Sequence, residues 1–181
     1  RYVEFLWTPK GFTDTKSVLD FLKEPESEAL MQEGRAVEDW AREEVLQTLK
    51  VFNAKHATEI SKEWGIEVPP LSEKEFDDYV GMGQTTLIRL SEFVHSKLLP
   101  LVEAEAERVR QELKNASAED QGVLQERLKK LDELTSVVLY QRWLRPSRNP
   151  EIPSLSEPAD DGRPNLLKID VQGLLSRLMH I

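Results

Sequence analysis

The fold is decided by the stretch ESEALMQEGRAVEDWAREEVLQTLKVFNAKHATEISKEW at residues 26–64. Its apolar side chains recur at intervals of three, four and their sums, which is the period of one helix face. These positions are Leu30, Val37, Ala41, Val45, Leu49, Phe52, Ile60 and Trp64. Acidic residues crowd the first turn, where the helix dipole favours them. Gly65 is a suitable C-terminal cap and Pro69-Pro70 prevents continuation, so the stretch predicts one long amphipathic helix.

Further helical patterns lie on both sides of this stretch. Asp14 can cap a short helix over 15–23, and Ser72 with Glu75 forms a capping box that opens a helix over 73–99. Helical periodicity continues over 101–114 after Pro100, where the helix either kinks or restarts. A helix over 118–145 has leucines spaced like a coiled-coil seam, at Leu124, Leu128, Leu131 and Leu134. Residues 114–122 read as the turn of an antiparallel helical hairpin.

The two ends of the chain differ from the helical middle. Residues 1–13 are aromatic and contain Pro9 and Gly11, which favours an extended arm. Five of the ten prolines fall within 146–166, and a short apolar helix capped by Asp170 follows. We therefore expect an all-α protein, an antiparallel bundle of about four to six helices with long helices, an extended N-terminal arm and a Pro-rich C-terminal arm. The expected domains are a bundle with its arm at 1–145 and a linker with a C-terminal helix at 146–181.

Charge and cysteine content limit the possible functions. The 181 residues contain 24 Lys and Arg against 33 Asp and Glu, so the net charge is −9. Such a surface repels phosphate backbones, and nucleic acid is not an expected partner. The absence of cysteine excludes thiol catalysis and cysteine-ligated metals, and it fits a reducing compartment. No apolar run is long enough to span a bilayer, so we expect no membrane partner and a cytoplasmic or nuclear location.

Catalytic motifs are scarce. The sequence has neither a Gly-x-Ser-x-Gly elbow nor a phosphate-binding loop, and His56 falls on an apolar row where a core histidine is the usual explanation. We expect no cofactor and no metal, and predict a non-enzymatic helical interaction or scaffold domain of a larger assembly. The alternative is a metal-dependent all-helical enzyme that uses acidic residues of the third helix. Its candidate residues are Asp77, Asp78, Glu92 and His95.

Three groups of residues are candidates for binding a protein partner or a second copy of the chain. Phe5 and Trp7 lie in the aromatic N-terminal arm. Arg142, Arg145 and Arg148 surround Trp143; they either complement a helix C-terminus with the indole in the core, or contact an anionic partner. Leu174, Leu175 and Leu178 share one face of the C-terminal helix, which either docks in a partner's groove or folds back onto its own chain.

Overall fold

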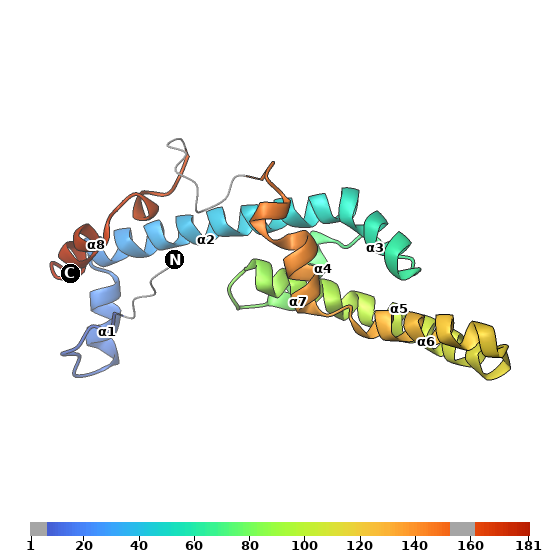
Figure 1. Ribbon diagram of the computed structural model, residues 1–181. Helices are drawn as coiled ribbons and strands as arrows, with labels where there is room; N and C mark the ends of the chain where they lie inside the picture. Colours follow the sequence, from blue (N-terminus) through green and yellow to red (C-terminus); the bar gives the residue numbers. More distant parts are fainter. Residues whose placement is uncertain (1–6, 153–161) are drawn as a thin grey trace. The chain divides into compact units, whose positions relative to one another are not determined.

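The computed structural model describes residues 7–152 and 162–181, and every regular element in these ranges is helical. Figure 1 shows the elements along the chain. The α-helices are α1 (Thr15–Leu22), α2 (Pro25–Val51), α3 (Ala57–Trp64), α4 (Glu73–Val80), α5 (Leu87–Asn115), α6 (Ala118–Asp132), α7 (Ser136–Leu139) and α8 (Val171–Leu178). The π-helical turns are Phe52–His56 and Tyr140–Leu144, and the 3-10 turns are Pro146–Arg148 and Asn165–Leu167.

The all-α class is confirmed, whereas the described helices α1 to α8 exceed the four to six that were expected. The antiparallel bundle with an arm at each end stays a prediction. No helix among the described residues is long and apolar enough to cross a membrane.

The chain divides into two compact units, which are described separately. Unit 1 contains residues 1–37 and 161–181, and unit 2 contains residues 38–160. Helix α2 contributes its first half to unit 1 and its second half to unit 2. The predicted boundary between residues 145 and 146 is not tested by this division and stays a prediction.

The helix predicted over 26–64 is formed by α2, a π-helical turn and α3 in direct succession. It ends as expected at Gly65, whose φ of +65° and ψ of 32° place it in the left-handed region that glycine adopts at low cost. Asn53, in the π-helical turn, accepts a hydrogen bond from the Leu71 backbone N–H (2.9 Å) and donates one to the Leu71 carbonyl (2.8 Å). This pair fixes the proline-rich return segment against the helix it leaves.

The single helix predicted over 73–99 is wrong, because the chain leaves the helical conformation between α4 and α5. The capping box is present as expected, with the Ser72 side chain accepting from the Glu75 N–H. Helix α4 ends at Gly81, which has a φ of +58° and a ψ of −123°. Thr86 then caps α5 by accepting from the Arg89 N–H. Helix α5 continues through Pro100, so the proline only removes a hydrogen-bond donor from within a long helix.

The single helix predicted over 118–145 is also interrupted. Helix α6 ends at Asp132, and Thr135 starts α7 by accepting from the Val138 N–H. A threonine at an N-cap satisfies an amide that would otherwise lack a partner, so the hydroxyl stabilises the break. The π-helical turn Tyr140–Leu144 completes this region.

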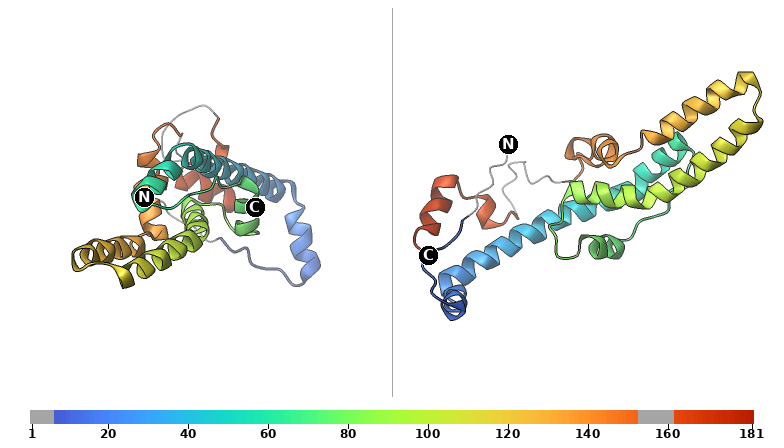
Figure 2. Two further views of the ribbon diagram at one scale, coloured as in Figure 1. Left: turned by 90° about the vertical axis from the view of Figure 1, so that its right-hand side faces the viewer. Right: turned by 90° about the horizontal axis from the view of Figure 1, so that it is seen from below.

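Helices α5 and α6 form the expected hairpin in unit 2, joined by a turn at residues 116–117 (Figure 2). Glu105 of α5 binds two arginines, Arg108 one turn later and Arg127 of α6, whose Nε lies 3.1 Å from the carboxylate. The hydrogen bond from Arg108 chiefly lowers the pKa of Glu105, burial opposes this, and the bond from Arg127 adds to the lowering. Leu131 is only 2% exposed at the base of the hairpin, which places this part of the leucine seam in the core.

The core of unit 2 is aromatic and dense. Phe76 of α4 and Phe93 of α5 are both buried with their ring centroids 5.4 Å apart. Trp64 of α3 meets Trp143 edge to face at 5.5 Å, and its indole N–H donates to the Lys130 carbonyl at 3.0 Å. These rings connect α3, α4, α5 and the 140–144 turn, so unit 2 has a hydrophobic core of its own.

Unit 1 lacks such a core among its described residues. Neither α1 nor α8 contains a fully buried residue. Within unit 1, only Ser27 of the described residues is buried, and it is polar. The caps at Asp14 and Asp170 are formed as predicted, with each aspartate accepting a backbone N–H. The helices of unit 1 therefore form as the local sequence predicts, with their apolar faces only partly buried.

Candidate interaction surfaces

Large apolar side chains are exposed on unit 1. The strongest examples are on α8 and just after it, where Met179 is 83% exposed, Val171 50% and Leu175 43%. On α1, Leu19 is 50% exposed. Isolated exposed leucines are ordinary on proteins, but here they accompany a unit with no buried apolar residue of its own.

The aromatic candidates of the N-terminus fall on either side of the described boundary. Phe5 lies outside the described residues. Trp7 is exposed, and its ring centroid lies 6.1 Å from that of Phe21 on α1; Phe12 lies 5.2 Å from the same ring. Trp7 therefore lies at the edge of a small aromatic cluster on α1.

The leucines predicted on α8 are placed on the same helix face but differ in exposure. Leu174 and Leu178 are half-buried, whereas Leu175 is exposed. Arg177 of the same helix forms two hydrogen bonds to Glu33 of α2, at 2.7 and 3.2 Å, and these chiefly lower the pKa of Glu33. This ion pair lies within unit 1 and fixes α8 to the start of α2 by polar contacts.

The arginines around Trp143 do not act as one cluster. Arg142 forms a two-pronged ion pair with Glu63, at 2.9 and 2.7 Å, and stacks on Trp143 with 4.4 Å between its guanidinium carbon and the ring centroid. Trp143 is 4% exposed. The indole thus lies in the core, and the Arg142 charge is already matched by a carboxylate. Arg145 and Arg148 have exposed side chains.

A buried polar network follows these arginines. Asn149 is 1% exposed; its side-chain amide donates to the carbonyls of Trp143 (2.7 Å) and Arg145 (3.2 Å), and its carbonyl oxygen lies 2.9 Å from Nε2 of His56. Since the asparagine NH₂ is used for the carbonyls, its oxygen must accept, and His56 must donate from Nε2. His56 is therefore a hydrogen-bonded core residue, as the sequence predicts.

Glu59 joins the same network from α3. It accepts from the Trp143 indole N–H at 2.9 Å and lies 3.4 Å from Nδ1 of His56. Burial acts to raise the pKa of Glu59, but hydrogen bonds with His56 and Trp143 outweigh it and lower the pKa overall. The network connects the end of the 140–149 segment to α3 by side-chain contacts alone.

Two of the acids considered for a metal site are bound by arginines in the structure. Asp77 is bound by Arg42 at 2.7 and 2.9 Å, Glu92 is bound by Arg89 at 2.9 Å, and His95 is half-buried on α5. Across residues 7–152 and 162–181, no group of three or more His, Cys, Asp or Glu side chains is arranged to hold a metal ion.

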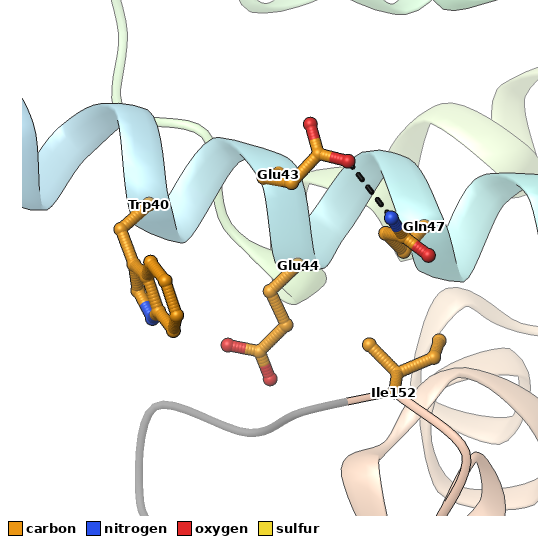
Figure 3. A pocket seen from close by; sticks show the side chains of 5 residues that line it. All are labelled: Trp40, Glu43, Glu44, Gln47 and Ile152. Carbon is orange, nitrogen blue, oxygen red and sulfur yellow. Dashed lines mark hydrogen bonds between the residues drawn. The ribbon is translucent and has the colours of Figure 1, made fainter. Parts of the chain in front are cut away.

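A pocket that the sequence did not identify lies on unit 2 (Figure 3). Its volume is about 90 Å³, and the described residues that line it are Trp40, Glu43, Glu44, Gln47 and Ile152. The first four belong to α2, while Ile152 comes from the segment after the buried Asn149. The spacing of Trp40 and Glu44 was available as a local signal, since residues four apart share a helix face. The contribution of Ile152 could not be predicted from the sequence.

Comparisons with known proteins found no matching family model, no matching curated protein and no matching solved structure. The functional argument therefore rests on the geometry of the two units.

Proposed function

We propose that this chain is a non-enzymatic protein–protein interaction or scaffold domain of a larger assembly, in which unit 1 binds a partner protein or a second copy. The proposal includes an antiparallel packing of the helices of unit 2 and a cytoplasmic or nuclear location, in keeping with the absence of cysteine.

The observation that carries the proposal is the contrast between the units. Unit 2 buries a continuous aromatic and aliphatic core, whereas no described apolar residue of unit 1 is buried. Ordering a backbone costs about 1–2 kcal/mol per residue, and burial of apolar side chains is the main compensation. Unit 1 lacks this compensation within itself, so a surface supplied by another molecule would stabilise its helices.

The gain available to such a partner is substantial. Full burial of one leucine, valine or methionine side chain contributes roughly 1.5–3 kcal/mol. The exposed faces of α1 and α8 offer Leu19, Val171, Leu175 and Met179, together with Trp7 from the N-terminal segment. Aromatic residues and methionine are also the types enriched at the centres of protein interfaces.

The test replaces exposed apolar side chains of unit 1 by charged ones and leaves every buried residue unchanged. Leu19→Glu combined with Leu175→Glu places charges on α1 and α8 of the full chain, at positions that are 50% and 43% exposed. Val123→Glu is the matched control, because Val123 is 70% exposed on α6 of unit 2. Self-association is measured by sedimentation equilibrium, and partner binding by quantitative capture with each of the three chains.

We expect the double variant to lose the association or the captured protein that the parent and Val123→Glu retain, with an unchanged circular dichroism spectrum. Equal association and equal capture by all three chains would contradict the assignment of unit 1 as the binding surface.

A further inference from the structure

A buried histidine of unit 2 has polar partners at both ring nitrogens. His56 is 3% exposed and lies in the π-helical turn Phe52–His56. Its Nε2 lies 2.9 Å from the side-chain oxygen of Asn149, and its Nδ1 lies 3.4 Å from a carboxylate oxygen of Glu59 on α3. The imidazole therefore lies between α3 and the end of the 140–149 segment.

The partners of the imidazole determine where its protons lie. Asn149 uses its NH₂ group for the carbonyls of Trp143 and Arg145, so its oxygen accepts and Nε2 of His56 carries a proton. A neutral imidazole has only this one proton, which leaves a lone pair on Nδ1 facing Glu59. An ionised carboxylate has acceptor sites only, so the two groups form a hydrogen bond only after Nδ1 takes up a second proton.

The Glu59 carboxylate is held in position from a second side and remains ionised. The same oxygen that faces His56 accepts from the Trp143 indole N–H at 2.9 Å. Burial acts to raise the pKa of Glu59, but the hydrogen bonds with His56 and Trp143 and the nearby charge of Lys55 lower it overall from 4.5. Histidine changes its charge at higher pH, between about pH 5 and pH 8, where Glu59 is therefore a carboxylate.

The other charged groups around His56 leave Glu59 as its charged partner. Arg142 of the 140–144 turn is bound by Glu63 of α3, at 2.7 and 2.9 Å. Four further cations of the neighbouring segments have exposed side chains: Lys55, Lys62, Arg145 and Arg148. Among the described residues, Glu59 is the charged side chain within hydrogen-bonding distance of the imidazole.

We propose that His56 is a pH-sensitive switch within unit 2. When Nδ1 takes up a second proton, it donates to the Glu59 carboxylate and fixes the 140–149 segment more firmly to α3. When Nδ1 loses that proton, its lone pair faces the carboxylate and the hydrogen bond is lost. The proton exchanges with solvent on the side of Glu59, whose side chain is 49% exposed.

The switch acts on a segment that reaches the pocket of unit 2. The Ile152 N–H donates to the Asn149 carbonyl at 3.0 Å, and Ile152 is one of the residues that line this pocket. A firmer attachment of Asn149 at lower pH therefore also holds Ile152 in place. All of these residues belong to unit 2, so the switch does not depend on the binding surface proposed for unit 1.

The first measurement locates the protons in the unmodified protein. NMR of the histidine ring nitrogens of the ¹⁵N-labelled full chain is recorded at about pH 8 and about pH 5.5, and His56 is assigned by its loss in His56→Gln. We expect a proton on Nε2 alone at the higher pH and protons on both nitrogens at the lower pH. Any other pattern at either pH would overturn the proposal.

The second measurement follows hydrogen exchange of the Trp143 indole N–H, which is bound by Glu59. The Trp64 indole N–H is the internal reference, because it donates to the Lys130 carbonyl in the same core and has the same exchange chemistry. An ion pair with one exposed partner contributes up to about a fivefold factor. The exchange rate of Trp143 relative to Trp64 should therefore fall about fivefold from about pH 8 to about pH 5.5.

Two variants with a control each assign this response. Glu59→Gln keeps an oxygen for the Trp143 indole but removes the charge, so the relative rate should change less than about twofold with pH. Glu67→Gln is the control at an exposed acid after α3, and His95→Gln is the control for a second histidine; both should keep the fivefold response. Circular dichroism confirms that the variants keep their helices.

Three exchange results would contradict the switch: a relative rate that is equal at both pH values in the parent, a full response in Glu59→Gln, or an equal loss of the response in Glu67→Gln. The parent measurements need no variant that could fail to fold, beyond the one that assigns the His56 signal.

Discussion

Replacing Asn149 by alanine tests the buried polar network of unit 2. The side chain is 1% exposed and makes three contacts, donating to the Trp143 and Arg145 carbonyls and accepting from His56. Alanine removes all three contacts and leaves two carbonyls and one imidazole N–H without these partners.

The expected cost follows from the burial of these groups. A buried polar group that loses its partner costs about 1–3 kcal/mol. The Arg145 contact is the longest, at 3.2 Å, so it adds the least, and water entering the vacated space offsets part of the rest. We expect Asn149→Ala to lower the free energy of unfolding by about 3 kcal/mol.

Urea denaturation followed by near-ultraviolet circular dichroism measures this loss, because the Trp64 and Trp143 rings are packed in the same core. Asn115→Ala is the control at the exposed end of α5, and it should change stability by less than about 0.5 kcal/mol. Asn149→Asp keeps an acceptor for His56 but turns an oxygen toward two carbonyls, so it should destabilise at least as much as alanine. A loss for Asn149→Ala no larger than that for Asn115→Ala would refute the network.

Three further predictions concern the hairpin and the helix breaks of unit 2. Leu131→Asp buries an unpaired charge at a 2% exposed site, and urea denaturation should show a loss of at least about 3 kcal/mol in the free energy of unfolding. The control Val123→Asp, at a 70% exposed site, should lose less than about 0.5 kcal/mol. Equal losses would contradict the placement of Leu131 in the core. Gly81→Ala, at a φ of +58°, should lower the stability by about 1 kcal/mol or more. Gly122→Ala lies within α6 with open space at its Cβ and should raise the melting temperature. A stabilising Gly81→Ala together with a destabilising Gly122→Ala would contradict the helix break at Gly81. Glu105 has a pKa lowered from its usual value of 4.5, so its contribution to stability is present above that value and is lost as pH falls through the folded pKa. The loss of stability in Glu105→Gln should be at most about 1 kcal/mol, because the arginines that bind Glu105 are solvent-exposed, and it should shrink in acid. A loss that grows in acid would contradict the lowered pKa.

Helix starts could be predicted from the sequence because caps are local. Asp14, Ser72 and Asp170 each accept an amide only three residues away. The same holds for Gly65, whose conformation is decided by the absence of a side chain. These features need no information from the rest of the chain.

Helix breaks were harder to predict because apolar periodicity continues across them. Phe76 and Leu90 are both buried in one core, so their spacing resembles a single helix face although the chain leaves the helix between them. The signals that were present are Gly81 and the N-cap threonines Thr86 and Thr135. A threonine within an apolar pattern predicts a helix break only weakly, because the sequence does not show whether its hydroxyl accepts from an amide.

The pocket on unit 2 depends on contacts that the sequence does not specify. Trp40 and Glu44 are one turn apart and could be paired from the sequence alone. Ile152 reaches them only because Asn149 is buried in a network with His56, and this contact joins positions 93 residues apart. The proline-rich composition of 146–166 indicated a solvated linker and gave no sign that Asn149 and Ile152 would be buried.

Hydrogen exchange measured by mass spectrometry on the dilute full chain tests the central claim most directly, since that claim is that unit 1 lacks a core of its own. The account predicts that amides of α1 and α8 exchange far faster than those of α5 around the buried Phe93 and Leu98, and that they become protected when a partner or a second copy binds. Protection of α1 and α8 equal to that of α5 in the dilute, monomeric chain would show that unit 1 is stable by itself and would contradict the account.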